Sequence, residues 1–295
     1  MKNLTIFRTE KGWKPNFELL KNNLSVPGKM GFGWQLLRDD NPDITVGSNH
    51  LIVCEKQEKL LPASVINQAL KTRIAQIETE QGYKVGKKMR NDLKQQITES
   101  LYAKAFTVSK FFNVWINTEH DLMCVETTSE LVTDNVLSFL IRDLDWRGHR
   151  LVTDKNADGL MRDLILFDSG VGNLSVGRSC VLQDRYETGK NITYKNELLD
   201  TGIVSNYVME DKRPVKLEIV LHSGDNECCF TIDSRCVISK ITLPDMVEDR
   251  SVFDTDDDYF DNEFTIRSGQ CLKIINELIG TLGEQQPLSE QEKAA

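Results

Sequence analysis

Apolar residues recur along this chain with two periods, one typical of strands and the other of helices. Residues 50–56 and 106–126 have the continuous or alternating apolar pattern of β-strands, and the polar residues 118–121 predict a hairpin turn. After Pro62, and again over residues 87–104, apolar residues repeat every three to four positions, which predicts two amphipathic helices. A meander of three further strands is predicted at 215–221, 227–233 and 236–242. Because strands and helices are mixed without a strand–helix–strand repeat, we expect an α+β fold with mixed antiparallel sheets.

The length of 295 residues allows one large domain or two ordinary ones. We predict an N-terminal α+β region over residues 1–146, which contains the helix pair, and a C-terminal β-rich region over residues 147–283. The second region is expected to end in a helix that Ser268 caps and that Gly280 and Gly283 terminate.

Several features predict a cytoplasmic protein without a membrane partner. No stretch approaches the ~18 apolar residues of a membrane span, and the first residues become polar too early for a signal peptide. The seven cysteines are dispersed, lack a Cys-x-x-Cys pair and mostly lie in apolar stretches, which favours buried thiols in a reducing compartment. Residues 284–295 are polar and are expected to form a disordered tail.

Charge is distributed unevenly along the chain. Residues 71–104 contain eight basic and four acidic residues, so this window is +4, which leaves −13 for the remainder of a chain whose net charge is −9. Lys87, Arg90 and Lys94 recur at helical spacing on one face of the second helix. The window is interpreted either as an ordinary solvated helix pair or as a phosphate-binding surface, which needs cations on one face and no base-reading side chains.

Motifs that support catalysis are missing from the sequence. The four histidines form no metal-binding pair, and no P-loop or Gly-x-Ser-x-Gly motif occurs, so no cofactor is expected. The acidic stretch 254–258 does not continue as a calcium-binding loop, because Tyr259 and Thr265 occupy the positions that require Gly and Glu. This stretch is therefore interpreted as a solvated acidic face, with metal binding, DNA mimicry or repulsion of DNA as alternatives.

Three stretches of the sequence resemble the RdgC family of bacterial recombination-associated proteins. They are Leu60–Glu78, Leu101–Phe106 followed by Trp115-Ile116, and Phe260–Gly283. The resemblance implies a horseshoe-shaped protomer that pairs into a ring-shaped homodimer with a positively charged central hole. It also implies that duplex DNA threads the hole without sequence preference, that the protein restrains RecA-dependent recombination, and that it is associated with the nucleoid.

The resemblance also carries over to individual residues. Phe106 matches an aromatic residue at a dimer interface of the family. Lys195 lies near the family's basic finger tip, although Glu197 follows where a neutral amide is usual. The resemblance places eight cations on the DNA side: Lys71, Arg73, Lys87, Lys88, Arg90, Lys94, Lys104 and Lys195.

Two other classes of function remain as alternatives. The family is sometimes described as an exonuclease, which would need a metal site that the sequence does not display. The chain could instead be an interaction factor that acts directly on RecA or on another recombination or defence protein. Self-association and duplex DNA are the expected partners, with RecA as a further one.

Overall fold

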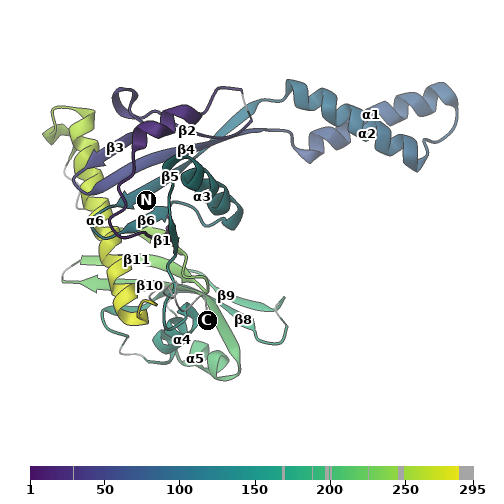
Figure 1. Ribbon diagram of the computed structural model, residues 1–295. Coiled ribbons are helices and arrows are strands. Elements are labelled where there is room, and N and C mark those ends of the chain that lie inside the picture. Colours follow the sequence, from purple (N-terminus) through teal and green to yellow (C-terminus); the bar gives the residue numbers. More distant parts are fainter. Residues whose placement is uncertain are drawn as a thin grey trace, which may run out of the picture.

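The computed structural model describes residues 1–28, 30–167, 170–187, 189–196, 199, 201–224, 226–244 and 249–285. Two antiparallel sheets with helices on their faces make up the body of the molecule (Figure 1). The expected α+β class with antiparallel sheets is thereby confirmed.

The first sheet contains the N-terminal strands and has the order β2-β4-β5-β6-β1-β7, with β3 also paired to β4. All of its pairs are antiparallel. The hairpin predicted within residues 106–126 forms β5 and β6. The strands are β1 (Thr5–Thr9), β2 (Gly31–Trp34), β3 (Asp43–Val46), β4 (Asn49–Lys59), β5 (Thr107–Asn117), β6 (Leu122–Val125) and β7 (Gly148–Arg150).

Both faces of this sheet are buried, and successive residues of a strand enter different clusters. On β5, Val114 and Ile116 pack into a cluster with α3 (Glu130–Leu144) and the short helix Phe17–Asn23, whereas Trp115 packs into the larger cluster on the other face. The period-two alternation of a strand explains this division.

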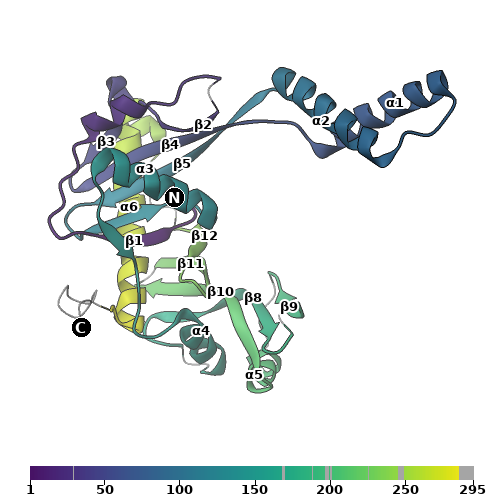
Figure 2. The ribbon, with the colours of Figure 1, turned by 45° about the vertical axis from the view of Figure 1, so that its right-hand side comes forward.

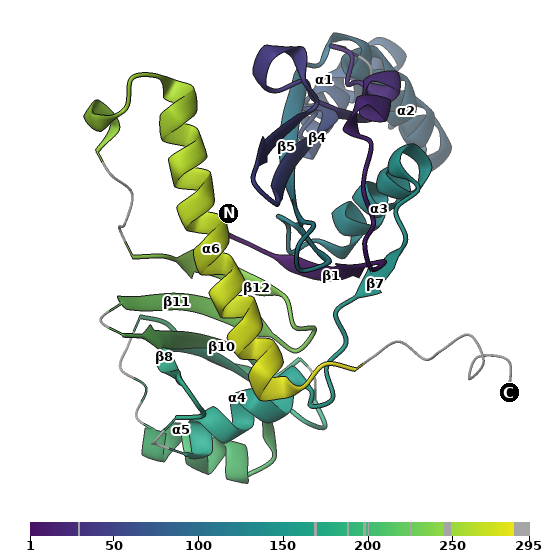
Figure 3. The ribbon, with the colours of Figure 1, turned by 60° about the vertical axis from the view of Figure 1, so that its left-hand side comes forward.

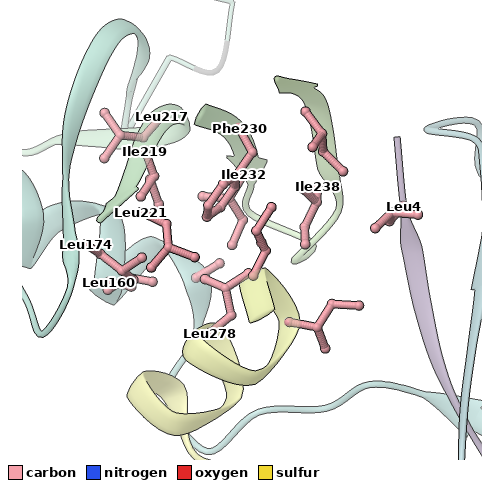
Figure 4. Packing of buried hydrophobic residues seen from close by; sticks show 14 of the residues in the cluster. Leu4, Leu160, Leu174, Leu217, Ile219, Leu221, Phe230, Ile232, Ile238 and Leu278 are labelled. Carbon is pink, nitrogen blue, oxygen red and sulfur yellow. The ribbon is translucent and has the colours of Figure 1, made fainter. Parts of the chain in front are cut away.

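The second sheet contains the predicted meander and has the order β12-β11-β10-β8-β9. Leucine and isoleucine side chains of this sheet pack against α6 and α4 (Figure 4). Helices α4 and α5 were not predicted from the sequence. The elements are α4 (Ala157–Leu166), β8 (Leu174–Asp184), β9 (Asn191–Tyr194), α5 (Thr201–Met209), β10 (Lys212–Ser223), β11 (Asn226–Asp233), β12 (Ile238–Thr242) and α6 (Asp256–Leu282).

The two sheets are joined by the segment before β1. Leu4 exchanges two backbone hydrogen bonds with Ile238, at 2.8 and 3.0 Å, and the amide of Ile241 donates to the carbonyl of Lys2 at 3.0 Å. Helix α6 lies across both sheets (Figure 3), and its buried side chains belong to the cluster that also contains Leu4 and Trp115. One continuous core therefore connects the N-terminal and C-terminal sheets.

The predicted start of the last helix was wrong. Helix α6 begins at Asp256, where the Thr255 hydroxyl caps the amide of Asp258 at 3.0 Å. Ser268 lies buried in mid-helix and donates to the carbonyl of Thr265 at 3.1 Å. Inside a helix, a serine hydroxyl can donate its hydrogen bond to a carbonyl of the preceding turn. Carboxylates near a helix N-terminus interact favourably with the helix dipole, and the first turn of α6 accordingly consists of Asp256, Asp257 and Asp258.

The other end of α6 matches the prediction in part. Gly283 terminates the helix with φ 74°, whereas Gly280 lies within it. Beyond it, Arg8 donates to the carboxylate of Glu284 at 2.7 Å, and the amide of Gln285 donates to the carbonyl of Val152 at 3.0 Å. The rest of the predicted tail, residues 286–295, is outside the described residues.

Five of the seven cysteines are buried, as predicted, whereas Cys229 and Cys236 are partly exposed. Burial raises the pKa of the Cys54 and Cys271 thiols to about 12, which keeps them protonated near neutral pH.

Among the described residues, no helix is long and apolar enough to cross a bilayer.

The buried Asp143 of α3 connects that helix to the first sheet. Its carboxylate accepts hydrogen bonds from Trp34 Nε1 at 2.7 Å and from Asn23 Nδ2 at 2.8 Å, and it also pairs with Arg142. Replacing Asp143 by alanine leaves the buried indole N–H of Trp34 and the partly buried amide of Asn23 without an acceptor, so we expect a loss of about 2–4 kcal/mol in the free energy of unfolding, measured by urea denaturation. The matched control is Asp134→Ala at an exposed position of the same helix; equal stability of the two variants would contradict the prediction.

Candidate nucleic-acid interface

The most prominent feature of the molecule is a helical arm, defined here as residues 60–106. Strands β4 and β5 continue beyond the first sheet as a two-stranded ribbon and carry α1 (Ala63–Gln81) and α2 (Lys87–Lys104) at its end (Figures 1 and 2). The ribbon closes at the arm's root, where the amide of Leu60 donates to the carbonyl of Phe106 at 2.8 Å.

Local sequence signals explain why the arm folds back on itself. Gly82 terminates α1 in the left-handed conformation, with φ 75°, and its amide donates to the carbonyl of Glu78 at 2.9 Å. The Glu78 carboxylate accepts from the amide of Val85 at 2.9 Å, which fixes the turn into α2. The two separate helices predicted from the apolar repeats are confirmed.

The arm has a very small core of its own. Only Leu70 and Ile77 of α1 are buried, and α2 has no buried residue. Of the predicted apolar stripe of α2, Leu93, Ile97 and Leu101 are partly buried and Met89 is exposed. Two helices that bury so little of their apolar side chains leave a seam that is still open to a further partner.

The basic side chains of the arm are all exposed, and none of them forms an ion pair with a described residue. They include seven predicted DNA contacts: Lys71, Arg73, Lys87, Lys88, Arg90, Lys94 and Lys104. At about 100° per helical residue, Lys87, Arg90 and Lys94 lie within an arc of about 60°, whereas Lys88 lies about 100° from Lys87. The arm thus presents one concentrated group of three cations and further cations around it.

Carboxylates neutralise charge at the root of the arm rather than along it. Glu58 pairs with Lys110 and with Lys56, the latter at 2.7 Å, and these two hydrogen-bonded ammonium groups lower the pKa of Glu58 to about 2. Further out, Glu78 is occupied by the turn and Glu99 accepts from Gln95 at 3.0 Å. The positive charge of the arm therefore remains available to an external anion.

Lys195, the remaining predicted contact, lies on the other limb of the molecule. It follows β9 directly, is exposed and has no ion pair with a described residue, while Glu197 is outside the described residues. The arm and the β8–β9 hairpin extend to the same side, away from α6, which gives the protomer the outline of an open horseshoe (Figures 1 and 2).

Acidic residues are concentrated away from the arm, around the start of α6. Arg38 pairs with Asp257 and Asp261, both at 2.9 Å, and Arg250 pairs with Asp256 at 2.6 Å. The start of α6 and the tip of the arm are at opposite ends of the view in Figure 1. Folding thus separates the negative and positive parts of a chain that is acidic overall.

Side chains that could support catalysis are sparse. Within the described part of the chain, no group of three or more His, Cys, Asp or Glu residues is arranged to hold a metal ion. One polar row has no motif in the sequence, because Ser175 is 47 residues from His222: Ser175 Oγ lies 2.7 Å from His222 Nε2, and His222 Nδ1 lies 3.1 Å from Glu227. His222 and Glu227 are 46% and 64% exposed, so water screens this row, which we interpret as a surface network across three strands.

Fold and charge together define an α+β protein with a projecting cationic helical arm and an acidic opposite end. The chain belongs to the RdgC family: the family model described as "Putative exonuclease, RdgC" matches residues 1–285. The resemblance found in the sequence is thereby confirmed.

Relatives extend over the whole chain. The chain is similar to the recombination-associated protein RdgC of Burkholderia cenocepacia, with 26% identity over 306 residues that cover 100% of this chain and 99% of the relative. The protein of the same name from Ralstonia nicotianae is also 26% identical over 306 residues, with the same coverage. That from Bordetella pertussis is 25% identical and covers 96% of this chain and 97% of its own length.

Proposed function

We propose that this chain binds duplex DNA through the phosphate backbone, without sequence specificity, as a homodimer that encircles the duplex. The observation that carries the proposal is the arm, where eight exposed cations have no ion pair with a described residue. Backbone binding draws its free energy from the release of counterions, which requires cations on one surface and not a base-reading helix. Acidic residues at the other end of the molecule orient a DNA polyanion towards the arm.

The homodimer is supported by the apolar groups of the arm. Phe106 at the root is 83% exposed, and Tyr102 is 47% exposed. A C2 contact between two arms would cover these side chains and the open seam between α1 and α2. Two horseshoes joined in this way, and again at their other limbs, would enclose a hole with the arm cations and Lys195 facing the DNA.

The role in recombination follows from the relatives, which are named recombination-associated. A ring that occupies duplex DNA limits access of a strand-exchange filament to that duplex. We therefore propose that the protein restrains RecA-dependent recombination and that, as a DNA clamp, it is associated with the nucleoid.

Reversing charge on the concentrated cation group tests DNA binding. We expect Lys87→Glu combined with Lys94→Glu to weaken binding to all duplexes alike. The slope of log affinity against log salt should fall by about 1.8, at about 0.9 for each lost phosphate contact. The matched control reverses two exposed lysines outside the arm, Lys14→Glu with Lys273→Glu. Fluorescence anisotropy over a salt series provides the measurement, and unchanged affinity of the arm variant at low salt would contradict DNA binding through the arm.

Self-association is tested at Phe106. Phe106→Asp removes about 1.5–3 kcal/mol of apolar burial at each of two symmetric sites, so the dimer dissociation constant should rise at least about 100-fold. Leu131→Asp, at a 72% exposed leucine of α3, is the control and should leave association unchanged. Sedimentation velocity over a concentration range distinguishes the outcomes; a wild-type chain that stays monomeric at all concentrations contradicts the dimer.

Exonuclease activity is the second candidate, because the family model carries that description. We propose instead that the protein binds DNA without cleaving it, since the described residues provide no carboxylate cluster for a two-metal mechanism. Purified protein incubated with Mg²⁺ or Mn²⁺ and end-labelled duplex should leave the label intact. Release of labelled nucleotides that co-purifies with the protein and that Lys87→Glu/Lys94→Glu weakens at limiting DNA would establish the enzyme.

A further inference from the structure

A cavity of about 390 Å³ lies at the root of the arm, between strands β4 and β5 and the segment that leads into β2. Its wall combines polar and apolar groups in about equal measure. The residues that matter for its chemistry are Ser25, Gln35, Glu55, Gln57, Ser109 and Phe111.

Two polar side chains of this wall are buried and hydrogen-bonded. Glu55 and Gln57 are only 5% and 4% exposed. Gln57 Oε1 accepts from the amide of Gly28 and its Nε2 donates to Ser25 Oγ, both at 2.9 Å. Gln35 Nε2 donates to the carboxylate of Glu55, so both side chains are held in fixed orientations along the cavity.

Glu55 provides a fixed negative charge in this wall. Burial by itself would raise the pKa of Glu55, but hydrogen bonds from Ser109, Ser25, Gln57 and Gln35 outweigh burial and lower the pKa below its ordinary value. The carboxylate is thus ionised at neutral pH although it is almost fully buried.

No cation of the described chain forms an ion pair with Glu55. Lys56 and Lys110 point to the opposite face and pair with Glu58, because side chains alternate across a strand. Lys59 lies on the same face of β4 as Glu55, but its ammonium group donates to the carbonyl of Ala105 at 3.0 Å. Neutral hydrogen-bond donors, and not a cation, therefore stabilise this carboxylate, and its negative charge remains at the wall of the cavity.

An aromatic ring lies at the rim of the cavity. Phe111 is the cross-strand partner of Glu55 and is 60% exposed. Cross-strand partners have Cβ atoms about 4.5–5.5 Å apart, so a cation that approaches the carboxylate also meets the ring. A carboxylate paired with an aromatic face recognises organic cations.

We propose that this cavity binds one guanidinium or alkylammonium group, with Glu55 as the counter-charge and Phe111 as the cation–π partner. Two sources have this chemistry: a small free amine or guanidine, and a basic side chain of a second copy of this chain. The second source rests on the proposed homodimer, whereas the first is independent of it.

The test uses agmatine as the probe and the full chain without DNA, at a concentration where sedimentation shows monomer. Calorimetry should detect binding to wild type and to Glu58→Gln, the matched carboxylate variant on the opposite face. Binding should weaken at least tenfold in Glu55→Gln and about threefold in Phe111→Leu, which retains an apolar side chain. Uncharged butylurea should not bind to any of them.

A second arm of the experiment separates the two sources. If a second copy supplies the cation, Glu55→Gln and added agmatine should each weaken self-association, while Glu58→Gln should not. If the ligand is a free amine, agmatine should bind equally to monomer and dimer. Absence of agmatine binding to monomeric wild type, together with unchanged self-association of Glu55→Gln, would overturn the inference and leave the DNA-binding proposal untouched.

Discussion

The pairing of β4 with β5 is the constraint on which the rest of the structure depends. These strands pair over eleven residues, from Asn49 opposite Asn117 to Lys59 opposite Thr107. Their inner halves are central to the first sheet, with side chains buried on both faces, and their outer halves leave the body as a ribbon. Because antiparallel pairing fixes register along its length, the core determines where the arm projects and in which orientation.

Electrostatics then depends on this geometry. The arm moves its cations away from a chain of net charge −9, and α6 collects carboxylates at its first turn, where the helix dipole favours them. Net charge therefore does not indicate which ligands such a protein binds, because salt screens the interaction between surface charges that are more than about 8–10 Å apart. A duplex at the arm would interact with the local positive charge and not with the sum.

The arm also buries fewer of its apolar side chains than the body of the molecule does. Its two helices bury Leu70 and Ile77, whereas the body contains two large apolar clusters. The exposed aromatics at the root, the open helix seam and the cavity around Glu55 are adjacent features of one region. A segment with so few internal contacts is more easily reshaped by a partner than the sheets are.

The sequence alone determined the two arm helices, the β5–β6 hairpin and the meander, because these depend on periodicity and turn chemistry that are local in the chain. It also identified the cations of the arm and the family. Only the tertiary structure decided that α6 starts at Asp256, because its first turn consists of three aspartates and lacks the apolar repeat that marks a helix in sequence. The tertiary structure likewise decided that Leu4 joins the sheets and that Glu55 is buried without a counter-charge, since both depend on residues distant in the chain being brought together by packing.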